Sequence, residues 1–560
     1  MPSVTLNQKV VEKLLGKKLS LEDLKDRISM LGTDLDSISD GQIKVEIFPN
    51  RPDLLCEHGF GRALSSFIGS HKGIRLYKVV PSGHKVMVDP SVAMRPFTVC
   101  AIVRGLSITE DQLAELIQLQ EKLATTHGRN RAKSAYGIYP LANISFPLRY
   151  VAMDPTTVSF QPLGFGHSMK ASEVLELHPK GRAYAHLTKG WTKYPFFVDA
   201  KDSVLCMLPF TNSEDTGKVS VGTKELFLES SGTDLRNCQV ALNIMVTALA
   251  DMGGKVESLE IVYPAKSAKV KSGNNIGTIV TPDLRATTMK FDAVYVEKVL
   301  GLKLKNTELV DLFARMGFVY SKGVVSIPCY RADILHPVDF VEDIAIAYGY
   351  ENFKPVIPKI ATIGEQDSFE KFISKLRVLC VGLGITEVVN YHLASKDDLS
   401  LFLESEDSKL VALKNAISEH NHLRQSILPG LLKTLSTNQH NEYPQEIFEV
   451  GRVFSFDSAF DCGVREDTAL GVALCHEKAD FTEIQQKVDA LCVALGLQIR
   501  IKEMTHPSFI TGRVGALFAE KKVIGFIGEV HPRVLTSAGV MMPVVVGHID
   551  LRALYDICHM

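Results

Sequence analysis

The stretch YRADILHPVDFVEDIAIAYGY, residues 330–350, decides how the rest of this sequence is interpreted. Pro337 suits the first position of a helix, because the backbone N–H that proline lacks would have no partner there. We therefore predict a helix from Pro337 to about Tyr348. Its apolar residues recur at helical spacing and are expected to face the core: Phe340, Val341, Ile344 and Tyr348.

Acidic residues gather on the same stretch. Asp339, Glu342 and Asp343 have the i, i+3, i+4 spacing that places side chains on one helix face, and Asp333 could fold back onto it. Carboxylates without interleaved His or Cys favour a hard cation, so the cluster predicts a Mg²⁺ site. The alternative is that acids simply stabilise the positive N-terminal end of any helix.

A similar pattern occurs near the start of the chain, which indicates two copies of one helix–helix–strand unit. Residues 11–19, VEKLLGKKL, match residues 296–304, VEKVLGLKL, and residues 50–55, NRPDLL, match residues 330–335, YRADIL. The first copy lacks the acids: the positions of Asp339, Glu342 and Asp343 hold Gly59, Arg62 and Ala63. The unit itself does not require the cluster, which strengthens the metal interpretation.

Length and composition limit the classes of protein to consider. At 560 residues the chain exceeds one hydrophobic core, and roughly three to five domains are expected. A net charge of -2 provides no broad basic surface for nucleic acid. Ten cysteines without a C-x-x-C pair favour a reducing cytosol over zinc fingers or disulfides. No signal-peptide core is found, nor an apolar run near the ~18 residues of a membrane helix.

Residues 90–265 alternate β-rich runs with helices, which is typical of an α+β domain. A helix is expected over residues 109–126, with an inward face of Leu113, Leu116, Ile117 and Leu123. The basic loop at residues 128–133 is interpreted first as a solvated turn. Asn212, Ser213 and residues 230–234 are either helix caps or a pocket of hydroxyl and N–H groups. Because no Ser/His/Asp or Cys/His set is evident, hydrolysis there would need an oriented water.

After residue 365 a last domain is expected, an antiparallel sheet with helices on one side. Helices are predicted at 369–384 and 481–495, a strand at 446–456, and a hairpin at 513–532 that turns at residues 520–522. Residues 506–513 are expected to be a loop. No phosphate-binding loop or dinucleotide fingerprint is present in the sequence.

The chain resembles the β subunits of phenylalanine–tRNA ligase (phenylalanyl-tRNA synthetase) of the archaeal and eukaryotic type. The resemblance runs from residue 1 to about 551, and eight motifs occur in family order. They are NRPDLL (50–55), LQEKL to GRNR (119–131), the P-x-x-N-S segment (209–213), SGTD (231–234), the 330–350 stretch, LRQSILPGLLKTL (423–435), IFEVGRVF (447–454), and HPSF to IGEVHP (506–532).

The resemblance implies four domains of an α+β multidomain fold. Residues 1–88 and 270–360 would hold the two repeated, winged-helix-like units. Residues 89–265 would be a β-rich editing domain that hydrolyses tRNA mischarged with tyrosine. Residues 365–560 would be an inactive class II synthetase-like module, an antiparallel sheet with helices.

The resemblance also implies the partners. ATP and phenylalanine would be used on a separate catalytic α subunit, in a cytoplasmic α₂β₂ heterotetramer that binds tRNA and contacts no membrane. The family's Mg²⁺ site would fall on Asp333, Asp339, Glu342 and Asp343, and would brace the contact with the α subunit.

An editing site has a physical motive, because an apolar phenylalanine pocket rejects an added hydroxyl by only about 100-fold. Glu229 could accept a hydrogen bond from the tyrosyl hydroxyl. Two positions depart from the family pattern, since Cys206 replaces a serine and Ser231 a threonine. By resemblance the editing pocket comprises Phe197, Cys206, Asn212, Glu229, Ser231 and Gly232.

Two other functions fit parts of the sequence. A free-standing deacylase acting on mischarged tRNA in trans would need no synthetase-like last domain. A winged-helix reader of nucleic acid would be expected to carry a more basic surface.

Overall fold

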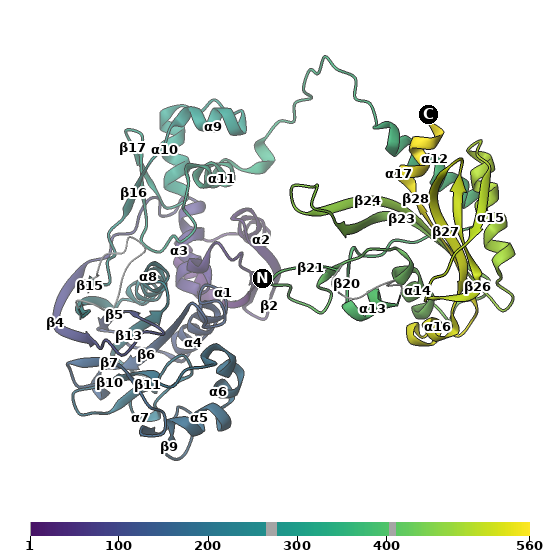
Figure 1. The fold of residues 1–560 in the computed structure, drawn as a ribbon. Coiled ribbons are helices and arrows are strands. Elements are labelled where there is room, and N and C mark those ends of the chain that lie inside the picture. Colours follow the sequence, from purple (N-terminus) through teal and green to yellow (C-terminus); the bar gives the residue numbers. More distant parts are fainter. Residues whose placement is uncertain (1, 265–276, 402–409, 560) are drawn as a thin grey trace. The chain divides into compact units, whose positions relative to one another are not determined.

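The computed structural model describes residues 2–264, 277–401 and 410–559 (Figure 1). The predicted domain limits at residues 1, 265, 270 and 560 lie outside the described residues. The chain has a mixed α+β, multidomain architecture with several sheets, and it divides into two compact units, Met1–Val356 and Ile357–Met560. No helix in the described ranges is long and apolar enough to cross a membrane.

The first unit begins with a small module in which a three-stranded sheet, ordered β1-β3-β2, packs against helices. Ser20 accepts the Asp23 N–H and caps the second helix, and Gly16, at φ 64°, ends the first, both as predicted. The elements are β1 (Ser3–Asn7), α1 (Gln8–Leu15), α2 (Leu21–Met30), β2 (Asp34–Ser39), β3 (Gln42–Glu46), η1 (Pro52–Leu54) and α3 (Glu57–Phe67).

A second module near the end of this unit has the same order of helices and strands. Its sheet is ordered β16-β18-β17, and both strand pairs are antiparallel, as they are in the first module. The predicted helix is found over Pro337–Tyr348, with Phe340 and Ile344 buried. The elements are β16 (Thr287–Lys290), α9 (Ala293–Leu300), α10 (Asn306–Arg315), β17 (Val319–Ser321), β18 (Val324–Ile327), α11 (Pro337–Tyr348) and η4 (Tyr350–Asn352).

Between the modules lies a ten-stranded sheet, ordered β12-β11-β10-β7-β4-β14-β5-β13-β6, with β15 paired to β14. Helices α4 (Glu110–Thr125) and α8 (Leu235–Asp251) contact it. The strands are β4 (Val79–Val88), β5 (Phe97–Arg104), β6 (Ser134–Pro140), β7 (Leu148–Met153), β10 (Tyr194–Val198), β11 (Val204–Met207), β12 (Thr211–Asn212), β13 (Glu225–Gly232), β14 (Lys255–Val262) and β15 (Thr278–Thr281). Shorter elements are η2 (Leu141–Asn143), β8 (Ser159–Phe160), β9 (Met169–Lys170), α5 (Ala171–Leu177), α6 (Pro179–Tyr184), η3 (Ala185–Thr188) and α7 (Glu214–Gly217).

This large sheet curves back on itself. The Tyr139 hydroxyl on β6 lies 3.3 Å from Asn212 Oδ1 on β12, although these strands stand at opposite ends of the strand order. The sheet therefore encloses an interior, which is filled by buried side chains such as Phe197, Phe227 and Tyr150. Its outer face packs on α4 and α8 in one core shared with both small modules.

Residues 230–232 lie in strand β13, and Asp234 caps α8. Two expectations for this region were wrong. Ile117 is 56% exposed, because only the Leu116 and Leu123 side of α4 meets the sheet. Residues 128–133 are not a plain solvated turn, because Arg131 is buried and donates to the carbonyl oxygens of Pro209 and Phe210.

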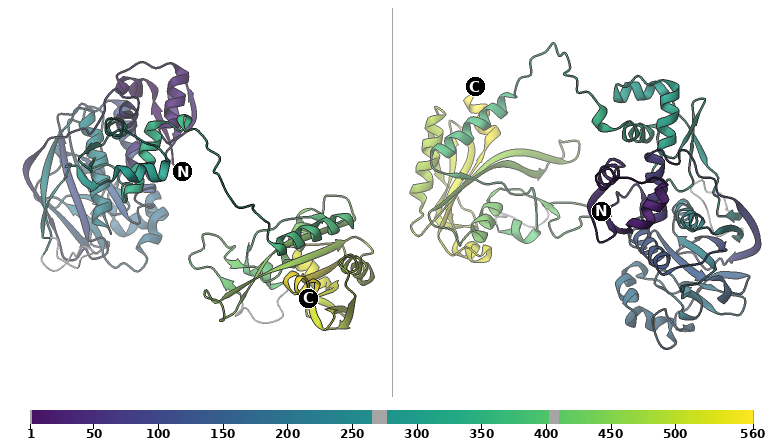
Figure 2. Two further views of the ribbon diagram at one scale, coloured as in Figure 1. Left: turned by 90° about the horizontal axis from the view of Figure 1, so that it is seen from above. Right: turned by 180° about the vertical axis from the view of Figure 1, so that it is seen from behind.

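The second unit is built on a seven-stranded sheet, ordered β19-β23-β24-β28-β27-β26-β25 (Figure 2). The predicted hairpin is present as β26 and β27. The helices are α12 (Ser368–Gly382), α13 (Lys396–Ser400), α14 (Leu428–Thr437), α15 (Phe481–Ala494), α16 (Pro532–Ala538) and α17 (Leu551–Cys558). The strands are β19 (Thr386–Glu387), β20 (Leu393–Ala394), β21 (Val411–Ala412), β22 (His422–Leu423), β23 (Gln445–Phe456), β24 (Val464–Cys475), β25 (Ile499–Glu503), β26 (Phe509–Ala519), β27 (Lys522–Val530) and β28 (Val544–Asp550).

Helices cover both faces of this sheet, so the prediction of helices on one side was wrong. Alternate residues of one strand enter different cores: Phe448 packs with α12, α15 and α17, whereas Ile447 packs with α14 and α16. Successive residues of β23 are therefore apolar, which is the pattern expected of a strand whose two faces are both buried. Residues 509–513, expected to be part of a loop, begin strand β26.

Candidate functional sites

The predicted metal cluster is divided among separate partners. Arg331 Nη2 donates to Asp333 Oδ2 and to Asp343 Oδ2, both at 2.7 Å, so a guanidinium lies between these two carboxylates. Burial tends to raise the pKa of Asp333, but the charges of Arg331 and Arg51 outweigh it and the pKa is lowered. The pKa of Asp343 is raised, because its burial outweighs the Arg331 charge.

The other two acids are engaged locally. Asp339 Oδ2 accepts the backbone N–H groups of Leu335 and His336 at 2.7 Å, which is the helix-capping role considered as the alternative. Both Glu342 oxygens accept from the Tyr350 hydroxyl at 2.8–2.9 Å. Within the described parts of the chain no three His, Cys, Asp or Glu side chains come together as metal ligands. The four acids as arranged therefore do not fit a preformed cation site.

The first module contains the matching ion pair. Arg51 donates to Asp53 at 2.8–2.9 Å, and the charges of Arg51 and Arg331 act on each other's aspartates. The two Arg-x-Asp sequences, 280 residues apart, thus lie together in one buried cluster. Their close pairing explains why arginines and aspartates are tolerated in an interior that would otherwise exclude charge.

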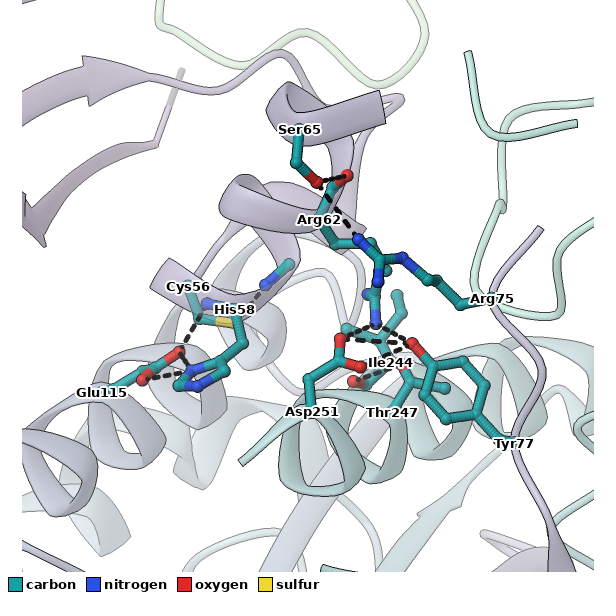
Figure 3. A network of polar contacts seen from close by, with 11 residues as sticks. Cys56, His58, Arg62, Ser65, Arg75, Tyr77, Glu115, Ile244, Thr247 and Asp251 are labelled. Atoms are coloured by element: carbon teal, nitrogen blue, oxygen red, sulfur yellow. Dashed lines mark hydrogen bonds and ion pairs between the residues drawn. The ribbon is translucent and has the colours of Figure 1, made fainter. Parts of the chain in front are cut away.

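Helix α3 of the first module docks onto the large domain through polar contacts (Figure 3). Arg62 donates to Asp251 and to the Tyr77 hydroxyl, each at 2.7 Å, and His58 Nδ1 lies 2.9 Å from both Glu115 oxygens. Arg62 occupies the position that corresponds to Glu342 of α11. The same helix position thus carries an internal salt bridge in one module and an exposed acid in the other.

Five of the six predicted editing residues come together inside the curved sheet, whereas Gly232 faces α8, where a Cβ would lie 3.1 Å from Cys238 Sγ. Cys206 and Phe197 are opposed on β11 and β10, while Glu229, Ser231 and Gly232 follow one another along β13. Ser231 donates to Glu229 Oε2 at 2.6 Å, and Asn212 approaches from β12. All except Asn212 are buried.

Glu229 is the ionisable centre of this group. Burial raises its pKa to about 7, against the hydrogen bond from Ser231 and the charge of Arg95. Ser231 Oγ also lies 2.8 Å from Thr98 Oγ1. A buried carboxyl whose pKa is raised in this way is a candidate functional group.

A cavity of about 240 Å³ lies beside α4, β6 and β12, and Asn212 is the one predicted editing residue that lines it. Its apolar lining includes Leu116, Ile117 and Phe210. Its polar lining includes Lys180 and Lys218, which form ion pairs with Glu121 and Glu214.

Sequence reasoning missed the residues that complete the group. Tyr139, Thr98 and Arg95 reach it from β6, β5 and the segment before β5. Their distance in sequence from residues 197–232 hides this proximity. The sequence offered one weak signal, the β-rich character of residues 135–140. It predicts a strand but does not say into which core a given side chain points.

Comparisons with known proteins give matches along the whole length of the chain. Residues 1–70 match the Phe-tRNA synthetase beta subunit B1 domain, residues 289–350 the tRNA synthetase B5 domain, and residues 354–551 the phenylalanyl tRNA synthetase beta chain CLM domain. The chain is 38% identical to the phenylalanine–tRNA ligase β subunit of Pyrococcus furiosus over 99% of its own length and 100% of that protein. The β subunit of Archaeoglobus fulgidus is also 38% identical, with 99% of each chain covered.

A solved structure agrees with the sequence comparisons. An N-terminal fragment of the phenylalanyl-tRNA synthetase β subunit from Pyrococcus horikoshii is 37% identical, with a TM-score of 0.57, over 62% of this chain and 99% of the fragment. The fold and these matches define an aminoacyl-tRNA synthetase subunit. The chain belongs to the phenylalanine–tRNA ligase β subunit family.

Proposed function

We propose that this chain is the noncatalytic β subunit of a cytoplasmic phenylalanine–tRNA ligase. It would support a catalytic α subunit that uses ATP and phenylalanine, in an α₂β₂ assembly that binds tRNA. The carrying observation is the similarity to named β subunits along 99% of the chain. We also infer four domains and two copies of one winged-helix-like unit, which the shared strand order of the two small modules supports.

A charging assay tests the subunit assignment. Phenylalanine attachment to its cognate tRNA is measured with the chain alone, with a candidate α subunit alone, and with the mixture. Activity confined to the mixture is expected. Charging by the chain alone would contradict a noncatalytic role, and deacylation by a chain that never needs a partner would favour the free-standing deacylase.

The exposed face of α11 is the proposed α-subunit contact. Leu335 is 66% exposed and Val338 is 43% exposed, next to the exposed Glu342. The corresponding residues of the first module, Leu55 and His58, are 1% and 7% exposed, and His58 contacts Glu115 of α4 (Figure 3). The first module buries these positions within the chain. The second module leaves them exposed, and an exposed apolar surface of this kind is suited to binding a partner protein.

Mg²⁺ at this contact is a separate proposal. Asp339 and Glu342 would have to leave their cap and tyrosine partners, while Arg331 keeps Asp333 and Asp343. The test is Mg²⁺ titration by calorimetry of the assembled complex, with Asp339→Asn and Glu342→Gln introduced together. We expect the double variant to lose binding and to assemble less well. Equal binding and assembly would refute the site.

We propose that the large domain hydrolyses Tyr-tRNA, with Glu229 accepting the phenol and a water near Asn212 attacking the ester. The buried polar group around Glu229, and the cavity that Asn212 also lines, support this. Deacylation of tyrosyl-tRNA and phenylalanyl-tRNA is compared between the complex and its Glu229→Ala variant. Selective loss of tyrosyl-tRNA hydrolysis is expected, and an unaffected rate would exclude Glu229.

A further inference from the structure

Tyr139 occupies the polar end of the enclosed group. Its hydroxyl lies 3.4 Å from Glu229 Oε1 and 3.3 Å from Asn212 Oδ1, and it shares a hydrogen bond with the Cys206 thiol. The side chain is fully buried. A phenol of the protein itself therefore stands among the side chains predicted to receive the phenol of a substrate.

The position of this ring depends on a neighbouring glycine. A Cβ at Gly137, two residues earlier on β6, would lie 2.2 Å from the Tyr139 hydroxyl oxygen. The glycine thus leaves the space that the phenol needs to fold back along its own strand. On its other side the ring packs on Phe227, with ring centres 5.8 Å apart. The ring is thus positioned mainly by packing, and it makes few polar contacts.

Its hydrogen bonds are weaker than those around it. Glu229 accepts from the Ser231 hydroxyl at 2.6 Å. The Tyr139 hydroxyl has one proton for three neighbours, and its distances to Asn212 and Glu229, 3.3 and 3.4 Å, are long for a hydrogen bond. A ligand phenol placed on Glu229 would replace these long contacts with a shorter one. Asn212 connects the two places, because it contacts Tyr139 and also lines the cavity.

We propose that Tyr139 is a specificity-determining gate, whose phenol fills the position that a ligand phenol takes on Glu229. The ligand class is a para-substituted phenol, including the tyrosyl side chain, and it enters only by displacing Tyr139. The tRNA part of this inference rests on the proposed deacylation. The binding of a simple phenol does not, and so the two can fail separately.

Binding of p-cresol tests the gate directly in the full chain. The wild type is compared with Tyr139→Ala, by thermal shift and calorimetry, with toluene as the matched ligand that lacks the hydroxyl. We expect the variant to bind p-cresol at least tenfold more tightly than the wild type does, and at least tenfold more tightly than it binds toluene. Equal affinity for both ligands would reveal a mere packing void and overturn the proposal. Tyr139→Leu provides the same comparison where the alanine variant does not fold.

Deacylation by the assembled complex tests the consequence. Tyr139→Phe keeps the ring and removes its hydrogen bonds, so Tyr-tRNA hydrolysis should rise about fivefold, the effect of losing one ordinary hydrogen bond from the closed state. The control is Tyr150→Phe, which removes another buried hydroxyl of the same interior, one that donates to Arg95 O at 2.9 Å. An unchanged or lower rate in Tyr139→Phe contradicts the gate. Absence of hydrolysis in every variant refutes the deacylase and leaves the cresol comparison to decide the gate.

Discussion

The first and second small modules share their order of elements and their buried Arg-x-Asp pairs. Their last helices differ, because α3 is buried against the large domain and α11 is partly exposed. In the first module, α3 is covered by α4 and α8, and Arg62 and His58 bind acids of those helices. In the second module the corresponding positions, Glu342 and Val338, are exposed. Two modules with the same order of elements thus differ in that the last helix is covered within the chain in the first and exposed in the second, and the difference lies in a few side chains.

The largest effect is expected at the buried pairs that both modules share. Arg331→Met leaves Asp333 and Asp343 buried without their cation, and should lower the free energy of unfolding by about 3–5 kcal/mol. Urea unfolding of the full chain measures it. The control Arg285→Met breaks an Asp283 pair of the same spacing at the surface and should leave stability unchanged. Equal effects of the two substitutions would disprove the structural role of Arg331.

Matched leucines give the next largest difference. Leu55→Ala removes a side chain that is 1% exposed and should cost about 3 kcal/mol, whereas Leu335→Ala, at 66% exposure, should stay within about 0.5 kcal/mol. Thermal unfolding of both full-length variants makes the comparison. A substantial loss in Leu335→Ala would mean that its face is already covered within the chain.

A third comparison separates stability from assembly. Arg62→Met removes hydrogen bonds from a buried cation to Asp251 and Tyr77, and should destabilise the chain by about 2–3 kcal/mol. Glu342→Gln at the corresponding position should leave unfolding unchanged and reduce co-purification with the α subunit. Reversed results, with the assembly defect in Arg62→Met alone, would contradict the division of roles between α3 and α11.

The smallest effect is the pH dependence contributed by Glu57 of the first module, which has no carboxyl counterpart in the second. Burial, together with the nearby Glu115 charge, raises the pKa of Glu57 above its ordinary value of 4.5, and Pro337 stands at the matching position. The folded chain thus binds this proton more tightly than the unfolded chain, so stability should fall as pH rises from 4.5 through the raised pKa.

Glu57→Gln should remove that loss, gaining about 1–2 kcal/mol on the wild type between pH 4.5 and 8. Denaturation midpoints at several pH values give the difference, and the exposed Glu22→Gln is the control. Parallel curves for Glu57→Gln and the wild type would show that Glu57 titrates normally.

Much of the local structure could be predicted from the sequence. Pro337 and Gly16 mark helix ends by backbone geometry alone, and the Ser20 cap needs only residues within one turn. The hairpin at residues 513–532 follows from two β-rich runs around a short polar turn. These features depend on neighbours in sequence, so they hold whatever the rest of the chain does.

The predicted sites were harder, because charge and burial depend on distant residues. The spacing of Asp339, Glu342 and Asp343 was correctly assigned to one helix, but burial of Asp343 beside Arg331 separates it from the exposed Glu342. Ile117 fits the apolar spacing of a helix but is exposed. Periodicity shows which residues share a helix face, but not how much of that face is covered by the sheet.

By itself, the sequence determined the helices with their caps, the paired motifs and the membership in a family of tRNA ligase subunits. Only the tertiary structure decided that the two Arg-x-Asp pairs share one cluster, that Asn212 meets Tyr139 across the closure of the sheet, and that α11 keeps an exposed face. The physical reason is that caps and periodicity are local, whereas desolvation, ion pairing and sheet closure are set by side chains brought together from far apart in the chain.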